Sequence, residues 1–153
     1  QAGTPEELYD TPASPFVAEF LGEINKLEGT VDRREENRLI ISLGEAGSIR
    51  CESAKEFPAG SRLACYIRPE HISLAATGEA EEFENTLRAT VTGESFYGSH
   101  TRYSVELAGG QTVTVPHRHA AEGNRTRVYQ NNQAVFIRFS IKSVTVFPAE
   151  VVR

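Results

Sequence analysis

The chain of 153 residues contains no methionine and only two cysteines. Because a natural chain starts with methionine, we expect this sequence to be a fragment of a longer protein. Two cysteines are too few for a disulfide scaffold, and Cys51 and Cys65 are interpreted as reduced, buried thiols. No signal peptide opens the chain, and no run approaches the roughly 20 apolar residues that a membrane-spanning helix needs. With 39% apolar residues, the composition instead predicts a folded domain.

Motifs for catalysis are also missing. The phosphate-binding pattern GxxxxGK[ST] requires a Gly-Lys pair, which the chain lacks, and there is no G-x-S-x-G nucleophile motif. His117 and His119, with Glu122 nearby, have a spacing that allows a metal site but is more typical of exposed imidazoles. We therefore predict no enzyme activity, no metal ion and no cofactor for this fragment.

The net charge of −5 is unevenly distributed. Residues 1–84 carry 17 acidic and 8 basic residues, a net −9, whereas residues 85–153 carry 4 acidic and 8 basic residues, a net +4. The acidic half argues against a general nucleic-acid-binding protein. The basic half is interpreted as a solvated face, with docking on an acidic partner as the alternative.

The first 22 residues have the capping pattern of two short helices. Thr4 and Glu7 form a capping box for the first helix, and Ser14 caps a second helix that stops at Gly22. Helices this short are marginal alone, so we expect the apolar face of the second to dock on another surface. This docking face consists of Phe16, Val17, Phe20 and Leu21.

After Gly22 the apolar pattern changes to the alternation of β-strands. Dense β-branched and aromatic residues predict a sandwich or a small barrel. The ten predicted strands are 27–33, 38–43, 48–53, 62–68, 71–76, 86–94, 101–107, 111–116, 133–139 and 143–148.

These strands fall into two related units, about residues 23–76 and 85–148. NKLEGTV at Asn25 matches NTLRATV at Asn85, an offset of 60, and ACYIR at Ala64 matches AVFIR at Ala134, an offset of 70. The extra residues are expected in the loop HRHAAEGNRTR, and the acidic stretch TGEAEEFEN between the units is interpreted as an exposed linker. Either each unit forms a small barrel or the units share strands in one core.

LAGGQ, residues 107–111, differs by one letter from the LSGGQ signature with which ABC-type ATPases bind phosphate. That signature works at the start of a helix, where backbone N–H groups face the phosphate. Here TVTVP follows, which has the alternation of a strand, and another predicted strand precedes. We therefore predict that Gly109 and Gly110 form a hairpin turn.

Two further stretches are candidate contact surfaces. In IRPEHISL, a proline inside a strand-like run predicts a break or corner, with Arg68 and Glu70 on one face as a solvated ion pair. Aromatic residues near 96–103 and at Tyr129 alternate with arginines, as in barrels that bind single-stranded nucleic acid, although core aromatics beside solvated arginines fit better. The candidate contact residues are Arg68, Pro69, Glu70, His71, Phe96, Tyr97 and Gly98, and the remaining residues of the aromatic pattern are Arg102, Tyr103, Arg125 and Arg127.

Three stretches of the chain resemble one known family. QAGTPEELYDTPASPFVAEFLG is similar to the segment after the nucleotide-binding domain of ABC importer ATPases, with the pattern Q-x-G-T-P-x-E-[LI]-Y-x-x-P and then F-V-A-x-F-[IL]-G. IRPEHISL resembles the IRPE motif of the C-terminal transport-associated OB domain, called TOBE. A third motif of that domain, N-x-L-x-[GA]-x-V…F-x-G-x-x-x-x-Y-x-V, is matched by Asn85, Leu87, Val91, Phe96, Gly98, Tyr103 and Val105.

The resemblance implies a mainly β, OB-fold-like β-barrel of two related strand units, preceded by two short helices. Residues 1–22 would link to an ATPase domain outside this sequence, and residues 23–153 would form the TOBE domain. Its implied role is non-catalytic regulation and dimerisation of the ATP-binding subunit of an ABC importer, nearest the spermidine/putrescine importers of the polyamine, iron and sulfate branch.

The resemblance also implies partners and a location. The partners are a second copy of the chain, its own ATPase domain, where ATP and Mg²⁺ would bind, and the permease subunits, with no nucleic acid. The location is cytoplasmic, on the inner face of the membrane. Two alternatives remain open at this point: a sensor of an oxyanion or a polyamine, and a single-stranded nucleic-acid-binding OB protein.

Overall fold

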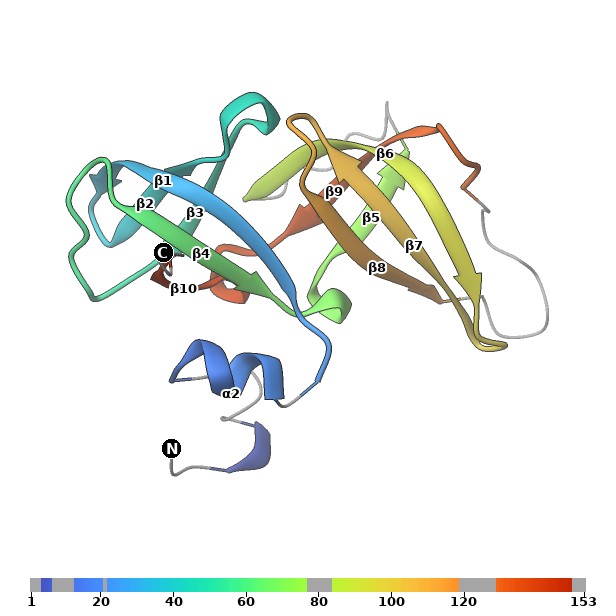
Figure 1. Ribbon diagram of the computed structural model, residues 1–153, viewed down its shortest axis with the longest axis horizontal. Helices are drawn as coiled ribbons and strands as arrows, with labels where there is room; N and C mark the ends of the chain where they lie inside the picture. Colours follow the sequence, from blue (N-terminus) through green and yellow to red (C-terminus); the bar gives the residue numbers. More distant parts are fainter. Residues whose placement is uncertain (1–3, 7–12, 21, 77–83, 119–128, 150–153) are drawn as a thin grey trace, which may run out of the picture.

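A computed structural model of the chain describes residues 4–6, 13–20, 22–76, 84–118 and 129–149 (Figure 1). The described fold is mainly β, and each of the ten predicted strands is present. One sheet has the strand order β10-β4-β1-β2-β3, and the other has the order β5-β9-β6-β7-β8. The first sheet consists of β1 (Asn25–Glu35), β2 (Arg38–Ser42), β3 (Ser48–Glu52), β4 (Arg62–Ile67) and β10 (Thr145–Pro148). The second consists of β5 (Ser73–Ala76), β6 (Asn85–Phe96), β7 (His100–Leu107), β8 (Thr112–Arg118) and β9 (Ala134–Phe139).

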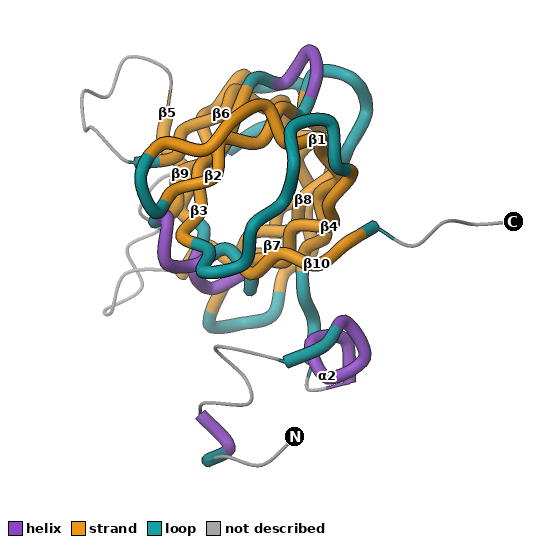
Figure 2. The backbone as a smooth tube through the Cα atoms, turned by 90° about the vertical axis from the view of Figure 1, so that its left-hand side faces the viewer, coloured by secondary structure: helices purple, strands orange, loops and turns teal. Residues whose placement is uncertain are grey.

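The two repeat units exchange their last strands. The first unit contributes β1 to β4 to one sheet, and then its 3₁₀ turn η2 (Pro69–His71) carries the chain across to β5 in the other sheet. The second unit does the reverse through η3 (Ile141–Ser143) and β10. The units therefore share strands, which resolves the alternative left open by the sequence. Seen from the end, the strands curve around a ring (Figure 2).

The pairing registers correct the second repeat offset. Asn25 pairs with Ile67 across β1 and β4, and Asn85 pairs with Phe139 across β6 and β9. Ile67 and Phe139 are 72 residues apart, two more than the offset of 70 suggested by ACYIR and AVFIR. A slip of two residues keeps every side chain on the same face of its strand, so the sequence match concealed it.

The inward faces of both sheets build one continuous apolar core. Leu27 and Leu63 from one sheet and Val105 from the other belong to the same buried cluster. Cys51 and Cys65 lie in this cluster as free, buried thiols, which confirms their interpretation. Burial raises the pKa of Cys51 to about 11 and raises that of Cys65 further.

Two equivalent asparagines join the sheets to each other. Asn25, at the start of β1, donates to the carbonyl of Thr114 in β8 and accepts from its N–H, both at 2.9 Å. Asn85, at the start of β6, exchanges the same two bonds with Arg50 in β3, at 2.9 and 2.7 Å. Each side-chain amide thus pairs like one more strand residue along the outermost strand of the opposite sheet. This buries Asn85, which the sequence had assigned to an exposed linker.

The second predicted helix is present as α2 (Pro15–Phe20). As expected, Ser14 caps it, because its Oγ accepts from the N–H of Val17 at 3.2 Å. The helix lies against the outer face of β4 and β10, where Ala18 is fully buried. The cluster at this contact consists of Ala18, Ile24, Ala64, Tyr66 and Phe147. Within the described ranges, no helix is long and apolar enough to cross a lipid bilayer.

Candidate functional site

The LAGGQ stretch forms the predicted hairpin between β7 and β8. Gly109 and Gly110 have φ angles of 94° and 101°, and the N–H of Leu107 donates to the carbonyl of Gln111 at 2.8 Å. The Gln111 side chain then bonds to the backbone of Glu28 in β1, accepting at 2.7 Å and donating at 2.9 Å. The stretch therefore connects the two sheets, a role of Gln111 that no sequence pattern indicated.

The corner at Pro69 is confirmed, but its charges lie differently from the prediction. Arg68 is only 3% exposed, and its Nη1 donates to the carbonyls of Gly22 and Glu23, both at 3.1 Å. Glu70, in contrast, is exposed, so the predicted solvated pair on one face is wrong. The reason is that η2 begins at Pro69, so Arg68 and Glu70 do not lie on one face of a continuous strand.

The tip of the β6–β7 hairpin carries an exposed aromatic pair. Phe96 and Tyr97 are 62% and 52% exposed, so the expectation that they are core residues is wrong. Gly98, with a φ of 74°, forms the turn, and the N–H of Tyr97 donates to the carbonyl of His100 at 2.9 Å. The Tyr97 ring stacks on the His100 ring, with 5.3 Å between the ring centroids. The guanidinium of Arg102 lies 5.0 Å from the centroid of the Tyr97 ring. Tyr97 is thus exposed and also held in place.

The other two aromatic residues of the predicted platform belong to the core. Tyr103 and Tyr129 are 1% and 3% exposed, and their rings meet edge to face at 5.4 Å. The hydroxyl of Tyr103 also accepts from the N–H of Tyr129. A surface for stacking several bases needs exposed rings, so this arrangement argues against the nucleic-acid alternative. Arg125 and Arg127 lie outside the described residues.

Glu23 connects the Pro69 corner to the hairpin tip. Its backbone carbonyl accepts from Arg68, and its carboxylate forms a 2.7 Å ion pair with Arg102. Of the seven candidate contact residues, five are exposed, and Arg68 and Pro69 are buried. They form two separate groups, at the corner and at the hairpin tip, and Glu23 and Arg102 connect the two groups. Neither was among the predicted contact residues, because their proximity depends on how the two sheets sit together.

The predicted docking face of the second helix is described only in part. Val17 is half-buried, whereas Leu21 and the side chains of Phe16 and Phe20 lie outside the description. The buried contact is made by Ala18, which sequence reasoning overlooked because it favoured large apolar side chains. Most of the first predicted helix also lies outside the described residues.

No metal centre is found among the described side chains, which include no group of three His, Cys, Asp or Glu placed to hold an ion. His117 is half-buried against the rings of Tyr103 and Tyr129, while His119 and Glu122 lie outside the description. A hollow of about 540 Å³ on the second sheet is lined by Arg88, Thr90, Thr92, Glu106 and Asn132, among others.

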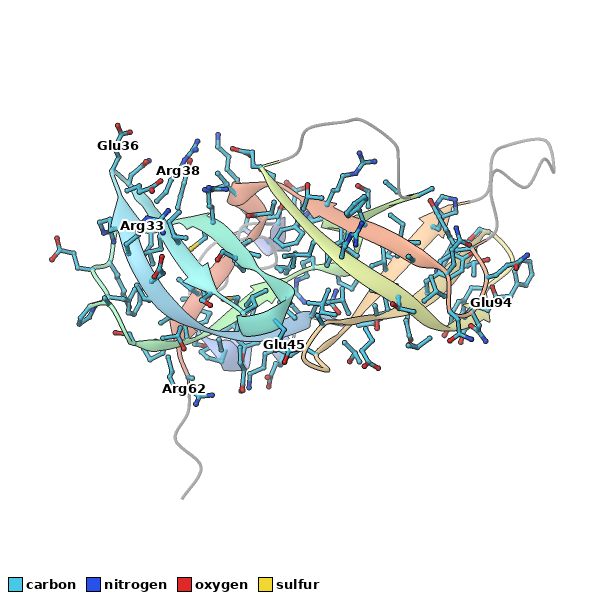
Figure 3. All side chains as sticks on the ribbon, turned by 90° about the horizontal axis from the view of Figure 1, so that it is seen from above. Arg33, Glu36, Arg38, Glu45, Arg62 and Glu94 are labelled. Carbon is cyan, nitrogen blue, oxygen red and sulfur yellow. The ribbon has the colours of Figure 1, made fainter. Side chains whose placement is uncertain are left out.

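Many other charged side chains lie at the surface, among them Arg33, Arg38 and Arg62, and Figure 3 shows Arg38 and Arg62 pointing away from the ribbon. Several of them pair locally. Arg33 contacts Glu35 at 2.9 Å and also Asp32, and these carboxylates raise the pKa of Arg33. Such exposed pairs contribute little to stability and do not by themselves mark a binding site.

The chain is similar to known proteins over most of its length. The family model described as TOBE domain matches residues 65–147. The spermidine/putrescine import ATP-binding protein PotA of Thermotoga maritima is 34% identical over 121 residues, covering 78% of this chain and 33% of that protein. PotA of Pseudomonas aeruginosa strain UCBPP-PA14 is 32% identical over 135 residues, covering 88% and 37%. The chain thus spans about a third of the length of these curated relatives.

A solved structure supports the fold independently. The cytoplasmic molybdate-binding protein ModG matches with a TM-score of 0.68 at 16% identity, over 82% of this chain and 96% of that one. At this identity the likeness concerns the fold alone. It supports the predicted mainly β, OB-fold-like class.

Proposed function

Because this chain belongs to the TOBE domain family, we propose that it is the C-terminal regulatory domain of the ATP-binding subunit of an ABC importer for polyamines. The observation that carries the proposal is the match to PotA proteins over 78% and 88% of the chain. We assign a polyamine as the transported solute, because these relatives are named as spermidine/putrescine import proteins.

The chain's own chemistry supports a non-catalytic role. Its one stretch that resembles an ATPase signature is a hairpin whose glutamine is bonded to Glu28. A signature that binds phosphate needs the free N–H groups of a helix start, and strand β8 follows instead. ATP and Mg²⁺ would accordingly bind outside this chain, in an ATPase domain.

The proposal includes partners and a location. We place the domain beside the ATPase domain of its own subunit, in contact with a second copy of itself, and in a complex with permease subunits at the inner face of the membrane. The exchanged strands suit this role, because two interlocked sheets form a rigid body whose surface contacts can bias a subunit between two arrangements.

The test compares the full product of the gene with the chain of 153 residues. We expect the full product to hydrolyse ATP and the chain alone to release no phosphate. Deleting the gene should reduce uptake of radiolabelled spermidine by cells, and the intact gene should restore it. A gene product without ATPase activity would refute the importer assignment, and unchanged uptake of spermidine would refute the polyamine.

A further inference from the structure

The short linker between α2 and β1 is held from both sheets at once. Arg68, at the end of β4, donates to the carbonyls of Gly22 and Glu23. Arg102, from β7 of the other sheet, pairs with the Glu23 carboxylate at 2.7 Å. Two guanidinium groups from opposite sheets therefore fix one residue of the linker, and they fix the direction in which α2 leaves the β-sheets.

The two guanidinium groups differ in their access to solvent. Arg68 is 3% exposed and lies inside the corner, where nothing from outside can reach it without disturbing the fold. The side chains of Arg102 and Glu23 are 34% and 43% exposed. A half-exposed ion pair is worth little enough to be broken by a modest competing interaction. The Glu23–Arg102 pair is therefore the adjustable part of this linker attachment.

Arg102 also belongs to the hairpin tip. Its guanidinium lies 5.0 Å from the centre of the Tyr97 ring, a cation–π contact, and the same ring stacks on His100. One cation thus contacts an aromatic side chain that is 52% exposed and a carboxylate that holds the helix linker. A displaced Tyr97 ring would remove one of the two contacts that position this guanidinium.

We propose that Arg102 couples the exposed hairpin tip to α2, so that a displacement of Tyr97 loosens Glu23 and frees the helix to reorient. The inference rests on the proposed function for its biological meaning, since α2 would lie between this domain and the ATPase domain. Coupling of this kind is reciprocal: release of Glu23 also changes how tightly Arg102 holds the Tyr97 ring. Arg102 and Glu23 act here as positioning residues.

The test measures the orientation of α2 in the chain of 153 residues. Spin labels on Glu19→Cys of α2 and Thr112→Cys of β8, both exposed positions, report the distance between helix and sheet. Cys51 and Cys65 are buried, so the labels attach to the introduced thiols. We expect one narrow distance distribution in this background and a broader one after Glu23→Gln or Tyr97→Leu. Amide exchange at Ala18 should rise roughly two- to fivefold in both variants.

Matched controls separate coupling from general loosening. Phe96→Leu makes a comparable change at the neighbouring, more exposed ring, and Glu35→Gln removes the partner of a different ion pair. Both should leave the distribution narrow. The double variant Glu23→Gln/Tyr97→Leu should be no broader than Glu23→Gln, because both changes break one pathway. If Tyr97→Leu behaves like Phe96→Leu, or if the two effects add, the coupling is refuted.

A salt titration covers the case in which a variant fails to fold. Raising ionic strength from about 0.1 to 1 M shortens the Debye length from about 10 to about 3 Å, which should broaden the distribution in the background protein. An unchanged distribution would show that the ion pair does not hold α2. These measurements involve no ATP, permease or polyamine. The coupling can therefore be refuted while the importer assignment stands, and the importer assignment can be refuted while the coupling stands.

Discussion

Replacing Asn85 with alanine should destabilise the protein far more than the loss of one small side chain suggests. Asn85 is 2% exposed and exchanges two hydrogen bonds with the backbone of Arg50. The variant leaves one N–H and one C=O of β3 without these partners. Arg50 is exposed on the outermost strand, so water can partly replace the lost partner. Each lost hydrogen bond costs about 0.5–1.5 kcal/mol, so we expect a loss of about 2 kcal/mol in the free energy of unfolding.

Thermal and urea unfolding, followed by circular dichroism, measure this loss. For a domain of this size, 1 kcal/mol lowers Tm by roughly 2–4 °C, so Asn85→Ala should melt about 4–8 °C lower. Asn131→Ala makes the same chemical change at an exposed turn and should stay within about 0.5 kcal/mol of the parent. Asn25→Ala, at the equivalent junction, should resemble Asn85→Ala. Equal stability of Asn85→Ala and Asn131→Ala would refute the view that these amides join the sheets.

Three further predictions concern single positions. Gly29→Ala should lower the free energy of unfolding in urea by about 1–3 kcal/mol. The reason is that a Cβ at this position would lie 2.5 Å from Ile41 Cγ2 and 2.8 Å from the Ser42 carbonyl. Val91→Ala, which creates a cavity instead of a clash, is the comparison and should cost about 1–3 kcal/mol. Gln111→Ala should cost about 1 kcal/mol, since its bonds to Glu28 are exposed, and calorimetry should detect no ATP binding before or after the change. Neither cysteine should react with a thiol reagent at pH 8 in the folded chain. Because burial raises the pKa of Cys51 to about 11, the unfolded state ionises its thiols first, and the free energy of unfolding should fall as pH rises from about 9 toward 11.

Local features of the chain were predictable because they depend on neighbours in sequence. Alternation placed all ten strands, and Pro69 marked the point where the chain leaves one sheet. The paired glycines of LAGGQ predicted a hairpin because strand-like residues flank them on both sides. Each of these conclusions needs only the backbone preferences of a few consecutive residues.

The arrangement of the two sheets was not predictable in the same way. A period of two residues tells which face of a strand is buried, but it does not tell which strand lies beside it, so the exchange of β5 and β10 left no trace in the pattern. Arg68 looks like a solvated arginine until the carbonyls of Gly22 and Glu23 are placed next to it. Phe96 and Tyr97 look like core residues until β6 is seen to continue past Thr90, where its pairing with β9 ends.

The exchange of terminal strands makes each half of the chain dependent on the other. A peptide that ended after β5 would lack the strand that borders β4, and it would carry one strand whose pairing partner, β9, was absent. Neither half can therefore complete its hydrogen bonding alone, and the two should unfold in a single cooperative step. After a protease cut between the halves, the two fragments should stay associated, because each contributes a strand to the other's sheet. Separately made halves should reassemble when mixed.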